Sequence, residues 1–284
     1  MWDDSDMMTK DVHRKIENIL LMGCDVDLEA CYRETALTEA EKRFHTDAIV
    51  VLSLNRENGQ IKLVSLMRDI WVSIPGYGMG KLNVAFRRGG PELIMKVVND
   101  AFHLNVRNYV LAGMDDMVRI VDLFGGVTME ISDEEADYIN DRVPEVLFMT
   151  ERGGDIPSLE KGGRCHLCGV QAVAHVRNRT IGYIEGRENR IHDLIRVIAA
   201  KAGNEMSIPQ LLIAGARSLK YVRTNIGILK GLSLVRFCLK ADFSEVKTYH
   251  APKEGTYVVK RDGTWRMETD FASAALYLWF FLLS

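Results

Sequence analysis

The sequence contains no hydrophobic run long enough to cross a lipid bilayer, which takes about 18 or more apolar residues. The most apolar segment, residues 271–284, is shorter and follows Thr269 and Asp270, which are suited to cap a helix. We therefore expect a terminal core helix there in preference to a membrane anchor. The N-terminus is polar and lacks the apolar core of a signal peptide. Such a start fits either a cytoplasmic protein or a chain cut just after an anchor.

The chain also lacks an excess of positive charge. It has 36 basic and 39 acidic residues, a formal net charge of −3, and 47% apolar residues, as in ordinary soluble globular proteins. Without a global basic field, binding of nucleic acid through bulk electrostatics is not expected. Any anion site in this protein must be local.

Several catalytic signatures are absent. There is no P-loop, nucleophile elbow or dinucleotide-binding fingerprint, and the seven histidines are scattered without metal-ligand spacing. These absences argue against nucleotide hydrolysis and serine hydrolase chemistry. Of the five cysteines, only Cys165 and Cys168 have the spacing of a metal-ligand or redox pair. We expect free thiols, with a disulfide and a zinc site as alternatives.

What the sequence does have is an alternation of short apolar runs and amphipathic segments. The expected strands are residues 18–25, a hairpin over 46–69 with an Asn-Gly turn, 108–113, 127–131, and a strand pair at 246–251 and 255–263. The expected helices are residues 89–104, 114–126, one beginning at Ser132, 170–176, 187–203 with Gly203 as its cap, 207–218 and 225–239. Residues 71–86 and 142–168 are expected to be loops. The alternation predicts an α/β fold, an α-β-α sandwich around a mixed central β-sheet, in a single domain.

Positive charge gathers in the stretch "HVRNRTIGYIEGRENR", residues 175–190. Its arginines are Arg177, Arg179, Arg187 and Arg190. Two of them stand at the start of an expected helix, where the helix dipole disfavours cations unless an anion is held between them. Guanidinium groups in such a place suit a phosphate. The alternative is a solvated surface on which Glu185 and Glu188 neutralise the arginines.

Acidic residues stand at the ends of the expected strands. Asp25 ends the first strand, Asp47 begins the second, and Arg68 and Asp69 follow the third. Strand ends are where ligands usually bind in α/β sheets, and carboxylates with phosphate and water oxygens are the usual ligands of Mg²⁺. Lys81 lies in the glycine-rich stretch that follows. The alternatives are turn-forming acids and an ordinary ion pair between Arg68 and Asp69.

Several blocks in this order resemble the LytR-CpsA-Psr family of bacterial cell-wall enzymes. They are "NILLMGCD", "HTDAIVVLSLN", "KLVSLMRDIWVSIPGYGMGKLNVAFRRGG", "VDLFGGVTMEI" and "CGVQAVAHVRNR…EGRENR". The resemblance runs from about residue 18 to 204, and residues 205–284 match only loosely. It implies transfer of a glycopolymer, such as teichoic acid or capsular polysaccharide, from an undecaprenyl diphosphate carrier to peptidoglycan. It also implies Mg²⁺, an arginine-lined diphosphate site and an apolar pocket for the prenyl chain.

Carried over by position, the resemblance assigns roles to individual residues. It implies that Asp25 and Asp47 hold the metal. It assigns the diphosphate to Arg68, Arg177, Arg179, Arg187 and Arg190, and we expect Lys81 of the glycine-rich stretch to join this set. The residues expected to act in catalysis are Arg68, Asp69, Arg177 and Arg179, with Asp69 or Asp47 orienting or deprotonating the acceptor hydroxyl.

The chain departs from the family pattern at three positions: His45 replaces an arginine, Met67 a proline and Ile191 a glutamine. His45 and Ile191 favour one alternative, a polyprenyl-diphosphate-binding module without transferase activity. A second alternative is a prenyl diphosphate phosphohydrolase, which would use water as the acceptor. The resemblance further implies an N-terminal membrane anchor that this chain does not include, preceding a polar segment over residues 1–17 and a catalytic domain over 18–284. The expected location is the extracytoplasmic face of the bacterial membrane.

Overall fold

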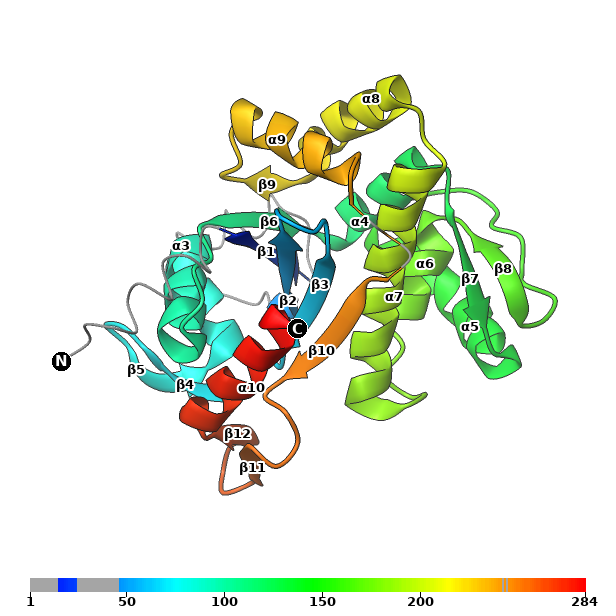
Figure 1. Ribbon diagram of the computed structural model, residues 1–284. Coiled ribbons are helices and arrows are strands. Elements are labelled where there is room, and N and C mark those ends of the chain that lie inside the picture. The colour runs from blue at the N-terminus through cyan, green and yellow to red at the C-terminus, as the bar shows by residue number, and fades with distance from the viewer. Residues whose placement is uncertain (1–14, 25–45, 242, 244) are drawn as a thin grey trace. The chain divides into compact units, whose positions relative to one another are not determined.

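The structure is a computed structural model that describes residues 15–24, 46–241, 243 and 245–284. The predicted metal ligand Asp25 and the departure at His45 lie outside the described residues. The chain divides into two compact units. The described residues of unit 1 are 15–24, 46–111 and most of 224–284, and those of unit 2 are 112–223. Figure 1 shows the elements of each unit.

Unit 1 is built on a six-stranded mixed sheet with the order β10-β3-β2-β1-β6-β9. Its strands are β1 (Ile16–Cys24), β2 (Thr46–Asn55), β3 (Ile61–Leu66), β6 (Asn108–Ala112), β9 (Arg223–Thr224) and β10 (Lys247–Ala251). β1 and β3 both pair with β2 antiparallel, whereas β10 pairs with β3 in parallel. Leu20, Val51 and Val64 are fully buried in its centre. The predicted hairpin over 46–69 is confirmed, with Gly59 at a φ of 77° in its turn.

A second sheet of unit 1 corrects two sequence predictions. It has the order β11-β12-β4-β5, with β4 (Ile70–Ile74), β5 (Gly78–Lys81), β11 (Tyr257–Lys260) and β12 (Arg266–Thr269). The predicted glycine-rich loop over 71–86 is therefore wrong: alternate burial of Ile70, Val72 and Ile74 makes β4 a strand. The predicted pairing of 246–251 with 255–263 is also wrong, because β10 pairs with β3 and β11 with β12.

The helices of unit 1 are α3 (Leu82–Phe102), α9 (Ile228–Cys238) and α10 (Phe271–Leu283). α3 begins seven residues before the predicted helix and bends where Gly89 and Gly90 leave helical geometry. The terminal core helix is confirmed: the Asp270 side chain accepts hydrogen bonds from two backbone amides of α10, which packs against α3 and β10. The buried Lys62 ammonium donates to the carbonyls of Phe281 and Leu282 at the other end of α10. No helix in the described ranges combines the length and apolar character needed to cross a membrane.

Unit 2 joins a two-stranded sheet to a group of helices. Its elements are α4 (Met114–Leu123), β7 (Val127–Ile131), α5 (Asp133–Met149), β8 (Gly163–Leu167), α6 (Gly169–Val176), α7 (Tyr183–Asn204), α8 (Ile208–Ser218) and the 3-10 turn η1 (Leu219–Tyr221). The prediction of a loop over 142–168 is wrong at both ends. Val143 and Val146 continue the buried face of α5, and β8 pairs antiparallel with β7.

The boundaries of α7 also differ from those predicted. The helix begins at Tyr183, after Gly182 with a φ of 72°, and it runs past Gly203 to Asn204. Gly186 is required inside the first turns, because a Cβ there would lie 2.6 Å from the carbonyl oxygen of Ile181. Cys165 and Cys168 are free thiols, as expected.

Candidate functional site

Four of the predicted site residues form one ion-pair cluster in unit 1, here called the Asp47 cluster: Asp47, Arg68, Asp69 and Lys81. Asp47 is the second residue of β2, Arg68 and Asp69 join β3 to β4, and Lys81 ends β5. Arg68 donates from Nη1 to Asp47 Oδ1, and its Nε lies 3.4 Å from Asp69 Oδ2. Lys81 Nζ donates to Asp69 Oδ1 at 2.6 Å. The guanidinium of Arg68 therefore bridges the two carboxylates.

The two signs of charge in this cluster differ in exposure. The side chains of Asp47 and Asp69 are only 12% and 13% exposed, whereas Arg68 is 34% and Lys81 25% exposed. Burial lowers the pKa of Arg68, but the attraction and hydrogen bonds of Asp47 and Asp69 outweigh it, so the pKa is raised overall. The guanidinium stays charged. The carboxylates are held inside while part of each cation faces solvent.

Backbone contacts and one aromatic ring fix the cluster in place. The amide of Asn83 donates to the carbonyl of Arg68, and the amide of Met267 to that of Asp69. The ring of Trp265 lies 5.6 Å from Lys81 Nζ, within cation–π range. Trp265 was not foreseen from the sequence, because it is 184 positions from Lys81 and enters through the unpredicted strand β12.

Oxygen ligands for a divalent cation are present in the Asp47 cluster. No group of three or more His, Cys, Asp or Glu side chains suited to a metal occurs among the residues that the structure describes. Mg²⁺ needs only one or two carboxylates when substrate phosphates and water complete its shell. Asp47 and Asp69 both contact Arg68 and are of this type. Of the two predicted metal ligands only Asp47 is among the described residues, and its carboxylate fits Mg²⁺ in chemical type.

The predicted diphosphate arginines of unit 2 begin at the loop 177–182, between α6 and α7. Asn178 is fully buried, and its Oδ1 accepts hydrogen bonds from the amides of Thr180 and Ile181, at 2.9 and 3.1 Å. This turn fixes the backbone on both sides of Arg179, whose side chain is exposed. Arg177 Nη2 lies 3.3 Å from Glu145 Oε1, and its Nη1 lies 2.9 Å from Met114 Sδ. Arg187 is half-buried on α7.

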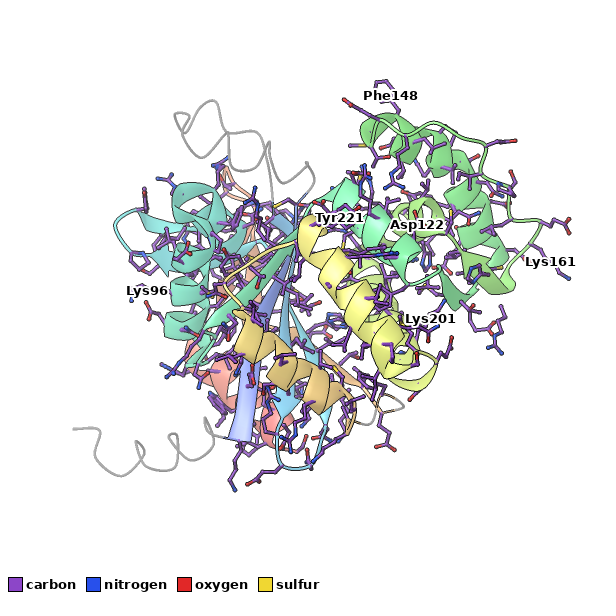
Figure 2. The ribbon with its side chains drawn as sticks, turned by 90° about the horizontal axis from the view of Figure 1, so that it is seen from above. Lys96, Asp122, Phe148, Lys161, Lys201 and Tyr221 are labelled. Atoms are coloured by element: carbon purple, nitrogen blue, oxygen red, sulfur yellow. The ribbon has the colours of Figure 1, made fainter. Side chains whose placement is uncertain are left out.

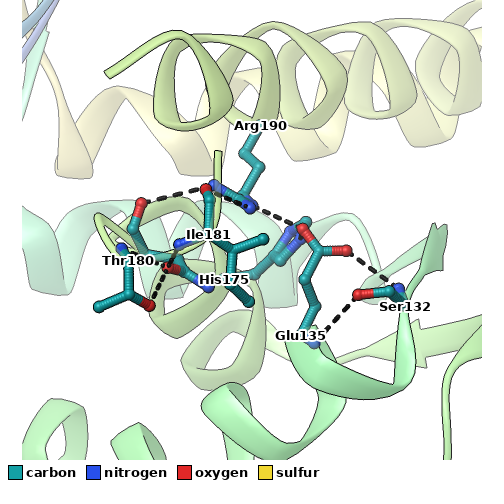
Figure 3. A network of polar contacts seen from close by, with 7 residues as sticks. Ser132, Glu135, His175, Thr180, Ile181 and Arg190 are labelled. Atoms are coloured by element: carbon teal, nitrogen blue, oxygen red, sulfur yellow. Dashed lines mark hydrogen bonds and ion pairs between the residues drawn. The ribbon is translucent and has the colours of Figure 1, made fainter. Parts of the chain in front are cut away.

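Arg190 differs from the other three arginines because its side chain is only 7% exposed. Nε donates to Glu135 Oε1 at 2.7 Å, Nη2 to the carbonyl of Ile181 at 2.9 Å, and Nη1 lies 3.5 Å from the carbonyl of Asn178. All three guanidinium nitrogens thus contact protein oxygens, and two of these oxygens are backbone carbonyls of the loop 177–182. Figure 3 shows Arg190 between this loop and Glu135.

Glu135 connects this arginine to two helices. Its Oε1 also lies 3.3 Å from Nε2 of the buried His175, and its Oε2 accepts from the amide of Ser132 in the capping box of α5. We call Glu135, His175 and Arg190 the Glu135 network (Figure 3). Burial raises the pKa of Glu135, but the Ser132 amide, Arg190 and His175 outweigh it and the pKa is lowered. Burial lowers the pKa of His175, so its imidazole favours the neutral form.

Within each compact unit the structure brings some of the predicted site residues together. Unit 1 brings Asp47, Arg68, Asp69 and Lys81 together, and unit 2 brings Arg190 to the loop that carries Arg177 and Arg179. Sequence reasoning missed Glu135 and His175. The serine-x-x-glutamate capping box was visible at Ser132, but nothing in it signals a second contact made 55 residues away.

The sequence matches a known protein family over nearly its whole length. The family model described as "LytR_cpsA_psr family" matches residues 3–275. TagV of Bacillus subtilis, named "Polyisoprenyl-teichoic acid--peptidoglycan teichoic acid transferase", is 25% identical over 232 residues, 79% of this chain and 53% of that protein. The chain spans only about half the length of TagV, and from 20% to 61% of several other curated relatives.

Solved structures share the fold over almost the whole chain. The crystal structure of B. subtilis TagV has a TM-score of 0.71 and 21% identity, covering 94% of this chain and 96% of that one. The structure "TagT bound to LIIa-WTA" has a TM-score of 0.68 and 19% identity, covering 95% and 90%. The predicted mixed α/β fold of a single domain is confirmed, since one alignment spans both compact units. With a family model that covers nearly all of its sequence, the chain belongs to the LytR-CpsA-Psr family.

Proposed function

We propose that this protein transfers a glycopolymer from a polyprenyl diphosphate carrier to peptidoglycan, at the extracytoplasmic face of the bacterial membrane. Family membership supports the proposal, because the relative TagV is named a teichoic acid transferase acting on a polyisoprenyl-linked polymer and peptidoglycan. The similar protein TagT has been solved with LIIa-WTA bound. The observation that carries it here is the loop 177–182, where a buried network fixes the backbone that presents Arg179 to solvent.

In the proposed reaction the acceptor hydroxyl oxygen attacks the phosphorus that carries the polymer. A bond forms between this oxygen and phosphorus, the bond to the lipid phosphate breaks, and the lipid phosphate leaves with the electron pair. Arg177 and Arg179 stabilise the negative charge that develops on the diphosphate. Asp69 takes up the hydroxyl proton, with Asp47 as the alternative base. Arg68 holds both carboxylates in place through its two ion pairs.

Lys81 and Arg68 contribute to the same reaction as partly exposed cations. Each is ion paired with Asp69 and has part of its side chain in solvent, so either cation can contact a phosphate oxygen without first leaving its carboxylate. Mg²⁺, which the family resemblance assigns to Asp25 and Asp47, would supply Lewis-acid stabilisation of phosphate charge there. Arg187 is assigned to the diphosphate as well.

The test is incubation with geranyl diphosphate and Mg²⁺, with and without a peptidoglycan acceptor, following binding, formation of geranyl monophosphate and release of orthophosphate. The Arg177→Ala, Arg179→Ala double variant is expected to lose binding by at least about tenfold, because two charge-assisted contacts disappear. Arg196→Ala is the matched control, since Arg196 is an exposed arginine on α7 paired with Asp193. Thermal melts verify that each variant is folded.

The outcomes separate three functions. Turnover that requires the acceptor and disappears in the double variant supports transfer. Orthophosphate release without acceptor indicates a prenyl diphosphate phosphohydrolase. Binding with no turnover, even when a polymer-loaded carrier and peptidoglycan are supplied, indicates a carrier-binding module. Equal binding of geranyl diphosphate by the wild type and the double variant would show that Arg177 and Arg179 do not bind the diphosphate.

A further inference from the structure

The sheet β11-β12-β4-β5 of unit 1 (Figure 1) has one side that faces solvent. β4 alternates between buried and more exposed residues, so Trp71 and Ser73 point away from its buried side. Ser73 is exposed, and Met79 on β5 and Val258 on β11 are 55% and 60% exposed. The strand register places six residues on this side, here called the outer face: Val258, Glu268, Trp71, Ser73, Met79 and Lys81.

Two tryptophans stand where the outer face meets the Asp47 cluster. Trp71 is paired across β4 and β5 with Lys81 and lies two residues after Asp69. Trp265 directly precedes β12, and its ring centroid lies 5.6 Å from Lys81 Nζ. The same ammonium donates to Asp69 Oδ1 at 2.6 Å. The outer face is therefore continuous with the carboxylate that we propose as the base of the transfer reaction.

Charged groups flank the ring of Trp71 on its other side. The guanidinium carbon of Arg266 lies 5.3 Å from the ring centroid. Arg266 donates to Glu268 Oε1 from Nε and Nη2, at 3.0 and 2.8 Å, and is also paired with Asp262. The side chains of Glu268 and Asp262 are 41% and 66% exposed. Their carboxylates therefore keep oxygens in solvent that can accept a hydrogen bond from a ligand hydroxyl.

We propose that the outer face binds the glycan strand of the peptidoglycan acceptor, with Trp71 and Trp265 as stacking surfaces for its sugar rings. A pyranose ring has a face of C–H groups whose slight positive charge suits the negative face of an indole. Its hydroxyl groups extend from the ring edge and suit charged partners such as Glu268. A sugar bound here presents a hydroxyl toward Asp69. The inference rests on the proposed function, because it names where the acceptor of that reaction binds.

The experiment is calorimetric titration of the protein, without carrier lipid, with a β-1,4-linked hexamer of N-acetylglucosamine. This soluble chain is built of N-acetylated amino sugars, as is the glycan of peptidoglycan. Trp71→Ala is expected to weaken its binding about tenfold, whereas Trp71→Phe keeps an aromatic face and should stay within about threefold of the wild type. Trp265→Ala should also weaken binding, and it provides the same test if Trp71→Ala does not fold.

Matched controls test whether the effect belongs to the outer face. Tyr277→Ala removes an aromatic ring that is 44% exposed on α10 and has Lys253 Nζ at 4.6 Å from its centroid. Arg266→Gln should weaken hexamer binding several-fold, because Glu268 loses the donor that orients it. Its control is Lys96→Gln, which removes an exposed cation of α3 that is paired with Asp100 (Figure 2). Both control variants should bind the hexamer like the wild type.

The outcomes separate this inference from the proposed function. Absent hexamer binding, or equal binding by the wild type and folded Trp71→Ala, overturns the inference even if the protein is an active transferase. Hexamer binding that depends on Trp71, in a protein that transfers nothing, overturns the proposed function and leaves the glycan site in place. In an active protein, Trp71→Ala should raise the KM for peptidoglycan about tenfold and leave geranyl diphosphate binding unchanged.

A second copy of the chain is the other occupant that the experiment must exclude. Sedimentation velocity of the wild type and of Trp71→Ala measures it. A dimer that this variant dissociates would overturn the inference, because the outer face would then be covered by protein. Monomers of both, with the difference in hexamer binding retained, would support a carbohydrate ligand.

Discussion

The Asp47 cluster and the Glu135 network both pair arginine with carboxylate, yet they expose their cations differently. In the Asp47 cluster Arg68 and Lys81 are 34% and 25% exposed, and their carboxylates lie beneath them. In the Glu135 network Arg190 is 7% exposed and its hydrogen bonds go to Glu135 and loop carbonyls. A cation that retains a solvent-facing side can meet a ligand, whereas one enclosed by carbonyls holds backbone in place. We therefore expect exposure to distinguish the cations that bind a ligand from those that hold the backbone.

The largest expected effect is the loss of stability on Arg190→Ala. This substitution leaves the Glu135 carboxylate beside the buried imidazole of His175 and removes the donors to the loop 177–182. Breaking a buried pair in this way costs about 3–5 kcal/mol of unfolding free energy. Urea unfolding at neutral pH measures this loss. The variant Arg190→Lys keeps the charge but not the planar set of donors, so its stability should lie between those of the wild type and Arg190→Ala. A loss below about 1 kcal/mol would contradict the structural role.

A second substitution determines whether Arg190 itself contacts the diphosphate, as the sequence resemblance implies. Glu135→Gln keeps Arg190 but removes the charge that orients it. If the network positions the loop, geranyl diphosphate binding falls several-fold in this variant as well. Unchanged binding in folded Glu135→Gln, together with lost binding in Arg190→Lys, would assign Arg190 to the ligand instead.

The next effect is a pH dependence carried by His175. Burial lowers the pKa of this imidazole below its ordinary 6.5, so below that pH the unfolded chain binds the proton more readily than the folded one. The unfolding free energy should therefore fall as the pH drops from 6.5 toward the folded pKa. The lowered pKa of Glu135 adds a further loss below about 4.5, its ordinary value.

Urea unfolding of His175→Gln between about pH 7.5 and 5 should give an unfolding free energy that depends less steeply on pH than that of the wild type, whatever the absolute stability of the variant. His166→Gln is the control, because His166 is exposed on β8, where its Nδ1 lies 3.2 Å from Thr128 Oγ1. Its profile should follow the wild type. A His175→Gln profile as steep as the wild type would show that another group carries the acid sensitivity.

The smallest expected effect on stability is that of Asp69→Asn in the Asp47 cluster. Its partners Arg68 and Lys81 are partly hydrated, so we expect a loss of about 1 kcal/mol. Function should respond more strongly: geranyl diphosphate binding tightens several-fold because a negative charge is gone, while turnover falls about a hundredfold with the loss of the base. If turnover survives in Asp69→Asn, we would infer that Asp47 accepts the proton instead.

Much of the fold could be predicted from the sequence because local patterns decide it. The hairpin over β2 and β3, the strand before α4, the capping box at Ser132 and the Asp270-capped terminal helix are all set by neighbouring residues. The errors lie where a local signal is outweighed. Glycines between β4 and β5 suggested a loop, but the pairing of Trp71 with Lys81 and of Met267 with Ile70 makes both segments part of a sheet.

The candidate site was predictable as a set of residue types but not as an arrangement. The spacing of Arg68 and Asp69 placed them at the end of β3, and the structure confirms this position. No sequence period links Asp47 to Arg68 across antiparallel strands, or Glu135 to Arg190 across 55 residues. The roles of Arg177, Arg179 and Arg187 toward a diphosphate stay predictions, as does that of Mg²⁺.

The pairing of β10 with β3 also sets an order of events during synthesis. β3 ends at Leu66 and its parallel partner β10 begins at Lys247, so residues 112–223 of unit 2 are translated between them. At ribosomal rates this interval is roughly 10–40 s. Throughout it, the sequence "IKLVSL" of β3, wholly buried in the finished protein, has an unpaired edge. We therefore expect nascent chains that stop before residue 247 to require protection of this edge by a chaperone.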